Sequence, residues 1–125
     1  MPTVAVVGAS VHKDRPSHLA LARYRERGYT VWPVTPAVPD INGIATYPDL
    51  AALPGAPDLI SMYVNPGRGL AMLEAIVASR PRAVWLNPGA DGAPFAAALR
   101  ARGVVVVEGC SLVALAYGDP LQQLP

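Results

Sequence analysis

Short runs of apolar residues alternate along the chain with segments of helical periodicity. Within the first run, 3–7, polar residues do not alternate with apolar ones, which is typical of a strand buried on both faces. Comparable runs predict strands over 3–7, 29–34, 58–64, 82–86 and 104–107. The segments between them predict helices over 18–27, 68–79 and 93–102, with a turn of helix over 49–53 and a short helix over 112–115.

Local signals refine these elements. Ser17 is the expected N-cap of the first helix, and Gly28 suits its C-terminus. The second helix is expected to bury one face, made of Leu70, Leu73, Ile76 and Val77. The segment 37–56 is the longest irregular stretch. Trp85 is expected in the core, whereas Trp32 could belong to the core or to a ligand site.

The alternation of apolar strands with helices predicts the fold class. Parallel strands need crossover connections, which the helices supply, and such sheets carry helices on both faces. We therefore expect an α/β, Rossmann-like three-layer sandwich with a parallel sheet of about five strands, forming a single domain over 1–125.

Composition narrows the function classes. The chain has 125 residues, of which 52% are hydrophobic and 15% charged, so it can build a core and is not a disordered polyelectrolyte. A formal net charge of +1 argues against nucleic-acid binding. A single cysteine excludes an internal disulfide framework and a multi-cysteine metal site. With no signal peptide and no apolar segment near the ~20 residues of a membrane span, we expect a cytoplasmic protein without a membrane contact.

The most informative loop is 8–17, which follows the first strand. Ligands of such sheets lie outside the carboxyl ends of the strands, where the strand order reverses. Gly8 permits a sharp turn, and free amides with the following helix N-terminus attract phosphate. Ser10 and Ser17 add hydroxyls, Lys13 and Arg15 add positive charge, and Arg15 could hold a phosphate through two hydrogen bonds. The alternative is an ordinary strand-to-helix turn with solvated charges; the position in the fold favours phosphate.

Classical dinucleotide binding is disfavoured. The loop lacks the second and third glycines of the G-x-G-x-x-G pattern. The second strand ends at Val34, Thr35 and Pro36, with no acidic residue for the ribose hydroxyls before Asp40 and no arginine for a 2′-phosphate.

Six segments of the chain form a combination that can be compared with known families: 4–10 (VAVVGAS), 15–17 (RPS), 28–36 (GYTVWPVTP), 41–43 (ING), 47–50 (YPDL) and 83–86 (AVWL). Together they resemble the small CoA-binding domain proteins, which are free-standing relatives of the CoA-binding domain of the succinyl-CoA synthetase α subunit. Their combination is more specific than the Gly-Ala-Ser element alone.

The resemblance implies coenzyme A as the ligand, with its ADP part held by a Rossmann-type domain. It places around the phosphates Gly8, Ala9, Ser10, Arg15 and Ser17, to which we add Lys13 for its charge. It places beside the adenosine Thr35 and Pro36, and on the opposing wall Tyr63, Val64 and Asn65. Asn87, Pro88 and Gly89 are expected near the pantetheine path.

This chain also departs from the family pattern. Members often carry a basic residue just after the Val-Thr-Pro element, where Ala37 and Val38 stand here, so the contact to the 3′-phosphate is in doubt. After the third strand many members have Phe-Arg, whereas this chain has YVNPGR over 63–68, and we count Arg68 among the candidate contacts. Asn-Pro-Gly over 87–89 and Glu-Gly-Cys-Ser over 108–111 replace the family's Gln-containing and Asp-Arg-Cys-Pro elements.

Other polar residues have two interpretations each. Cys110, after the fifth strand, could be a nucleophile, a redox contact or a partner for a CoA thiol, but a lone cysteine is more often a small buried hydrophobe. His12 and His18 flank the first loop and could contact phosphate or assist a proton transfer, although histidines in polar surface loops usually do neither. They form no metal pair with other ligands. Asp91 and Glu108 could approach as an acid–base pair, although solvated loop positions are favoured.

The function expected from the sequence is therefore a non-catalytic CoA-binding protein with a small-molecule nucleotide ligand. Two alternatives stay open. One is an NAD(H)- or other nucleotide-binding enzyme or redox sensor that uses Cys110 or a histidine. The other is a nucleotide-binding subunit of a larger complex, and a homodimer is equally compatible with the sequence.

Overall fold

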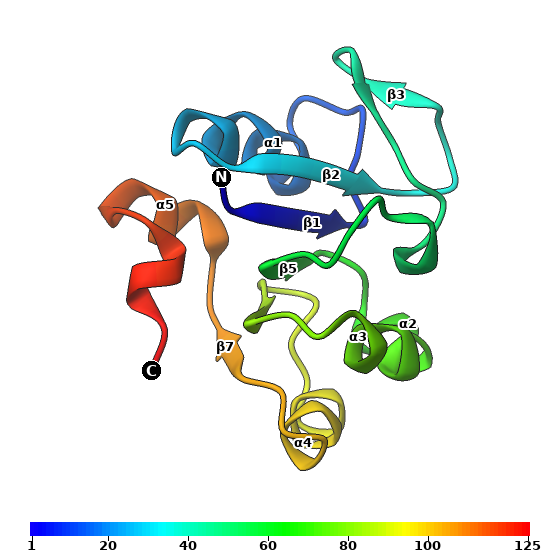
Figure 1. Ribbon diagram of the computed structural model, residues 1–125, viewed down its shortest axis with the longest axis vertical. Helices are drawn as coiled ribbons and strands as arrows, with labels where there is room; N and C mark the ends of the chain where they lie inside the picture. The colour runs from blue at the N-terminus through cyan, green and yellow to red at the C-terminus, as the bar shows by residue number, and fades with distance from the viewer.

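A computed structural model describes all of residues 1–125 and contains one parallel, five-stranded sheet. The strands lie in the order β2-β1-β5-β6-β7 (Figure 1). Their bounds are β1 Thr3–Val7, β2 Thr30–Val34, β5 Leu59–Met62, β6 Ala83–Leu86 and β7 Val106–Glu108. The five strands are the five that the sequence predicts: β1 has the predicted bounds, and the other four are shortened or shifted by one to three residues.

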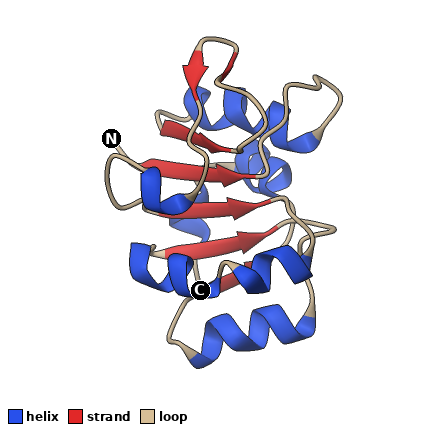
Figure 2. Cartoon of the chain, turned by 90° about the vertical axis from the view of Figure 1, so that its right-hand side faces the viewer, coloured by secondary structure: helices blue, strands red, loops and turns tan.

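Helices cover both faces of this sheet, in front of it and behind it in Figure 2. One face carries α1 (Pro16–Glu26) and α5 (Ser111–Tyr117), followed by the 3₁₀ turn η2 (Pro120–Gln123). The other face carries α2 (Pro66–Ala71), α3 (Leu73–Ser79) and α4 (Ala93–Ala101), together with the 3₁₀ turn η1 (Leu50–Ala52). The predicted Rossmann-like three-layer sandwich is confirmed.

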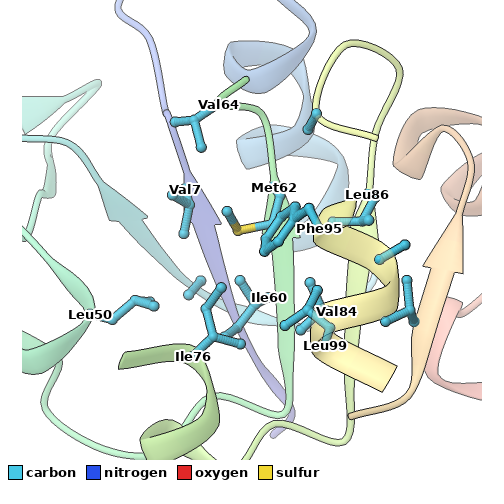
Figure 3. Packing of buried hydrophobic residues seen from close by; sticks show 14 of the residues in the cluster. Val7, Leu50, Ile60, Met62, Val64, Ile76, Val84, Leu86, Phe95 and Leu99 are labelled. Atoms are coloured by element: carbon cyan, nitrogen blue, oxygen red, sulfur yellow. The ribbon is translucent and has the colours of Figure 1, made fainter. Parts of the chain in front are cut away.

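The two helical layers pack on two hydrophobic clusters, one on each face of the sheet. Along β1, Ala5 and Val7 belong to the cluster under α3 and α4, whereas Val4 and Val6 belong to the cluster under α1. Both faces of the strand are therefore covered, which explains its uninterrupted apolar sequence. Figure 3 shows side chains of the first cluster, with Phe95 of α4 among the strand side chains.

The strand order reverses between β1 and β5. From β1 the chain passes to β2 on one side, and it then returns to β5 on the other side. The carboxyl ends of the two strands are tied together, because Tyr63 N donates to Val7 O at 2.9 Å. Gly8 N donates to Val34 O at 3.0 Å, so β2 ends at the same place. In an open α/β sheet this reversal is the expected position of a ligand.

The N-terminus of the first helix differs from the prediction. α1 begins at Pro16 with Arg15 at the N-cap position, and no side chain caps it. The prediction of Ser17 as N-cap was therefore wrong, and Ser17 lies buried in the first turn. Proline is favoured at the first helical position because its fixed φ suits the helix. An N–H group at that position would have no partner within the helix, so its absence costs nothing.

The predicted second helix is two helices. α2 starts at Pro66, where Asn65 Oδ1 accepts from Arg68 N at 2.9 Å, and α3 continues after a break at Met72 (φ −94°, ψ 3°). The break changes which residues face the core, and Leu70 is 41% exposed. The continuous apolar face predicted over 68–79 was wrong at that position.

The segment 37–56 is more ordered than predicted. It contains a short antiparallel hairpin of β3 (Asp40–Ile41) and β4 (Ile44–Ala45). The turn residues Asn42 and Gly43 both have positive φ, 51° and 78°. An Asn-Gly pair is a strong hairpin signal for that reason. At the other end of the chain, α5 is longer than the helix predicted over 112–115.

None of the helices combines the length and the apolar character that a membrane crossing requires.

A close approach between α2 and α4 depends on the absence of a side chain at Gly69. A Cβ atom there would lie 2.5 Å from Cε2 of Phe95, whose side chain is 1% exposed and belongs to the core. We predict that Gly69→Ala lowers the free energy of unfolding by about 1–3 kcal/mol, because the ring has no free space to enter. Urea unfolding measures this change.

The matched test is a double-mutant cycle with Phe95→Leu, which shortens the side chain that the new methyl group would meet. The double variant Gly69→Ala/Phe95→Leu should lose less stability than the two single variants added together. Strictly additive losses would contradict the proposed clash.

Candidate functional site

Two neighbouring cavities open where β1 and β5 end, and they share Gly8. The first has a volume of about 390 Å³, and its lining includes Gly8, Ala9, Thr35, Pro36, Pro48, Asp49, Val64 and Arg68. The second has a volume of about 310 Å³, and its lining includes Gly8, Ser10, His12, Arg15, Ser17, Tyr63 and Pro88. The structure thus gathers most of the candidate residues of the sequence at one edge of the sheet.

Gly8 is the residue that keeps this edge open. Its φ of +87° suits glycine, and a Cβ atom on it would lie 3.0 Å from Cγ1 of Val64 and 3.2 Å from the backbone carbon of Tyr63. Any side chain there would press against the end of β5. The bare backbone of Gly8 therefore forms the common floor of both cavities.

Three backbone N–H groups around the cavities are free to donate. The amides of Ala9, Ser10 and Ser17 make no hydrogen bond within the chain. Ala9 belongs to the first cavity and the two serines to the second. Unused amides beside the N-terminus of an 11-residue helix are the usual donors to an anion such as a phosphate.

His18 holds this loop in shape from the inside. Its side chain is buried; Nδ1 lies 2.7 Å from Ser10 O, and Nε2 lies 3.2 Å from Nδ2 of Asn42. These partners assign the neutral ring with the proton on Nδ1, which donates to Ser10 O, while Nε2 accepts from Asn42. Both nitrogens are used, so His18 supports the loop rather than meeting a ligand. His12 is exposed and lines the second cavity.

Two arginines at the cavities have no acidic partner. The ion pairs of the structure are Arg23–Glu26, Arg100–Glu108 and Arg102–Glu74, so neither Arg15 nor Arg68 is neutralised. Both side chains are exposed. Lys13, which the sequence analysis grouped with Arg15, lies instead in a third cavity between α1 and the β3–β4 hairpin.

A segment that the sequence analysis left irregular completes the first cavity. Tyr47 pairs with the end of β2: its N–H donates to Pro33 O at 2.9 Å, and its O accepts from Thr35 N at 2.8 Å. This pairing carries Pro48 and Asp49 to the cavity wall. Asp49 Oδ1 also accepts from Ala52 N at 3.0 Å, which caps η1. The sequence has no acidic residue directly after the second strand, but Asp49, further along the chain, places a carboxylate at the same cavity.

The described site can be compared with known proteins. The family model for the CoA binding domain matches residues 2–116, nearly the whole chain. This chain belongs to the CoA-binding domain family. The resemblance noted from the loop 8–17 and the second strand is thereby confirmed.

Relatives of this CoA-binding domain support the same fold. The Thermus thermophilus protein described as cell-free ID.343 is 32% identical, with a TM-score of 0.84 over 90% of this chain and 86% of that one. The uncharacterized protein YneT of Bacillus subtilis (strain 168) is 25% identical over 112 residues, covering 89% of this chain and 83% of YneT.

A larger protein contains a similar unit. The dinucleotide-forming acetyl-coenzyme A synthetase 1 of Ca. Korarchaeum cryptofilum has a TM-score of 0.72 and 18% identity, over 84% of this chain and 25% of the synthetase. At this identity the likeness concerns the fold alone.

Asn87 lies beneath the cavities of this CoA-binding domain rather than on their surface. It is 1% exposed; its Nδ2 donates to Ser61 Oγ at 3.0 Å and to Met62 O at 2.9 Å, and its Oδ1 accepts from Ser111 N at 2.7 Å. One amide thus joins β5, the end of β6 and the start of α5. The structure gives this side chain a bracing position, in place of the ligand contact expected from the sequence.

The remaining candidates are engaged locally. Asn65 is the N-cap of α2, and Gly89 N donates to Asp91 Oδ1 at 3.0 Å. Glu108 pairs with Arg100 at 3.6 Å, so Asp91 and Glu108 each have a partner of their own.

The two tryptophans lie outside both cavities. Trp85 is 4% exposed and belongs to the core, as predicted. Trp32 lies beside Gly55, where its Cη2 would be 3.5 Å from an added Cβ. Neither is among the residues that line the cavities. No group of three or more His, Cys, Asp or Glu side chains is arranged to hold a metal ion.

The bracing position of Asn87 has a measurable consequence. We predict that Asn87→Ala lowers the free energy of unfolding by about 2–3 kcal/mol, because Ser111 N–H is left buried without its acceptor. The same change at the exposed N-cap, Asn65→Ala, should cost about 1 kcal/mol. Urea unfolding of both variants compares them, and an equal or smaller loss for Asn87→Ala would be incompatible with the bracing role.

Proposed function

We propose that this chain is a non-catalytic protein that binds coenzyme A and holds its ADP part across the two cavities. The observation that carries the proposal is the coincidence of three free amides and two unpaired arginines around Gly8, in a member of the CoA-binding domain family. Main-chain donors and guanidinium groups are the usual partners of a diphosphate.

The second cavity is suited to the diphosphate. The free amides of Ser10 and Ser17 and the Arg15 side chain surround it, and the N-terminus of α1 adds a favourable dipole. The loop is already fixed by His18, so few groups need to be ordered when an anion binds.

The first cavity is suited to the adenosine. Its volume is about 390 Å³, and Pro36 and Val64 give its lining an apolar part for the base, beside the charged side chains of Asp49 and Arg68. This volume lies within the range of small-molecule sites, roughly 300–1,000 Å³. Arg68 reaches the same cavity, and we assign it to the 3′-phosphate, since Ala37 and Val38 offer no charge after β2.

A binding role, without catalysis, is supported by how three of the four candidate acid–base groups are used. The fourth, His12, is exposed and lines the second cavity, where we assign it to a contact with phosphate. His18 has both nitrogens engaged inside the protein, Glu108 pairs with Arg100, and Asp91 accepts from a backbone amide. None of the three is left facing the diphosphate position as a free proton donor or acceptor.

Ligand selectivity gives the first test. CoA present at about a hundred times its dissociation constant should stabilise the protein by ~2.7 kcal/mol, which a thermal-shift assay detects. Dephospho-CoA and ADP should give smaller shifts, because they lack the group assigned to Arg68. No shift with millimolar CoA would refute the proposed function.

Charge variants give a sharper test, measured as dissociation constants by calorimetry. Arg15→Ala should weaken CoA and dephospho-CoA alike by about tenfold, or ~1.4 kcal/mol, because both contain the diphosphate. Arg68→Ala should weaken CoA and leave dephospho-CoA unchanged.

Arg82→Ala is the matched control, because this exposed arginine precedes β6 at the opposite edge of the sheet and forms no ion pair. It should bind as the unmodified chain does. Equal losses in all three variants would indicate nonspecific attraction and contradict the assignment.

NAD(H) binding is the second candidate, and Asp49 is the observation that favours it. An acidic residue near the second strand is what ribose hydroxyls require, and this carboxylate lines the first cavity. If NADH binds more tightly than CoA and Asp49→Asn removes the preference, the second candidate replaces the first.

A further inference from the structure

The third cavity, between α1 and the β3–β4 hairpin, is separate from the two cavities at the edge of the sheet. Its volume is about 260 Å³, and four of its eight lining residues are apolar. It shares no lining residue with the two cavities that contain Gly8. A ligand in the third cavity would therefore leave the proposed nucleotide site open.

The apolar part of this cavity comes from two elements. Leu19, Leu21 and Ala22 belong to α1, and Ile44 belongs to β4. Leu19 is 40% exposed, although it lines the cavity. An apolar group that entered the cavity would remove part of this leucine surface from water, which is favourable.

Two cationic side chains line the same cavity, and no carboxylate does. Lys13 lies in the loop after β1, and Arg25 lies in the last turn of α1. Neither side chain takes part in an ion pair of the structure. The cavity thus has two positive charges beside its apolar part. A carboxylate is attracted to both, and an arginine can hold it through two parallel hydrogen bonds.

The wall between α1 and the hairpin is formed by His18 and Asn42. His18 is 9% exposed and has both ring nitrogens engaged, with Ser10 O at 2.7 Å and with Asn42 Nδ2 at 3.2 Å, so its neutral ring adds shape and no charge. The second N–H of the Asn42 amide has no partner in the chain and adds one donor. This wall exists before a ligand binds, which lowers the entropic cost of binding.

The third cavity differs in chemistry from the second. Around the second cavity, free backbone amides and a helix N-terminus suit a compact phosphate. In the third cavity half of the lining residues are apolar, and the charges are carried by two side chains. A singly charged group with an apolar body satisfies both features, because the body covers Leu19 and Ile44 while the charge meets Lys13 and Arg25.

We propose that the third cavity is a second binding site of this protein, which takes a small carboxylic acid with an aromatic or branched apolar body. The site is independent of the nucleotide site, and both can be occupied at the same time.

The experiment is a titration of the full chain, followed by NMR through its backbone amide signals. The probe is phenylpropionate. Phenylpropionamide has the same body without the charge, and acetate has the charge without the body. Phenylpropionate should bind saturably, with the largest shifts in the segments 13–25 and 42–44. Each of the two comparison compounds should bind at least about fivefold more weakly, because each lacks one of the two matched features.

Variants of α1 test the assignment of the site. Arg25→Gln should weaken phenylpropionate by about fivefold, the loss expected for an exposed ion pair. Arg23→Gln is the matched control, because Arg23 is an exposed arginine of the same helix that pairs with Glu26 and does not line the cavity. Ala22→Leu fills the cavity from an exposed helical position and should remove saturable binding, while its amide spectrum shows whether the fold is kept.

Several outcomes would overturn the second site. These are no saturation by ~10 mM phenylpropionate, equal binding of the acid and its amide, and equal losses in Arg25→Gln and Arg23→Gln. Displacement of phenylpropionate by saturating CoA would also do so, because the cavity would then belong to the nucleotide site. The titration itself needs no CoA, so it tests this inference even if CoA does not bind and the proposed function fails.

Discussion

The close contact between Gly8 and the end of β5 is the constraint on which the rest of the site depends. Two parallel strands end at this point, and the polar backbone groups that follow them need partners or solvent. Gly8 N and Tyr63 N are satisfied by Val34 O and Val7 O. The neighbouring amides of Ala9 and Ser10 are not. The turn at Gly8 that brings the chain close to Val64 is therefore followed by two amides without a partner in the chain. One conformation of this turn therefore has two results: the backbone groups of Gly8 and Tyr63 are bonded within the sheet, and the amides of Ala9 and Ser10 stay free for an anion.

The second structural constraint is polar and buried. On the α1/α5 face, the buried polar residue Ser61 interrupts the apolar sequence of β5, and the buried Asn87 follows β6. Burying a polar side chain lowers the stability of the fold unless the side chain is hydrogen-bonded. Asn87 bonds groups from three separate elements, and so fixes the start of α5 relative to β5 and β6.

The fold was predictable because burial on both faces leaves a direct signature, an unbroken apolar run such as 3–7. The edge of the sheet that carries the site was predictable for the same reason, since strand direction follows from helical crossovers. Side-chain roles were less accessible. His18 and Asn87 were candidate ligand contacts from their position in the sequence. Apart from Ser10, which is eight positions before His18, their hydrogen-bond partners are 24 or more positions away. Asp49 reaches the cavity only through the pairing of Tyr47 with β2, which no local pattern encodes. The Asn42-Gly43 turn, by contrast, carried a readable hairpin signal that the irregular composition around it concealed.

Charge distribution explains how a nearly neutral chain can be suited to a highly charged ligand. A net charge of +1 gives little long-range attraction to polyanions. Close to the two cavities the supply of anion-binding groups is larger: two guanidinium groups without an ion-pair partner and three free amides lie around them. Amides act only at hydrogen-bond distance and lose little to screening by salt, so they favour a compact diphosphate over an extended phosphate backbone. In the proposed function, selectivity for the nucleotide of CoA thus comes from the geometry of β1 and α1, and the arginines refine it by distinguishing the diphosphate from the 3′-phosphate.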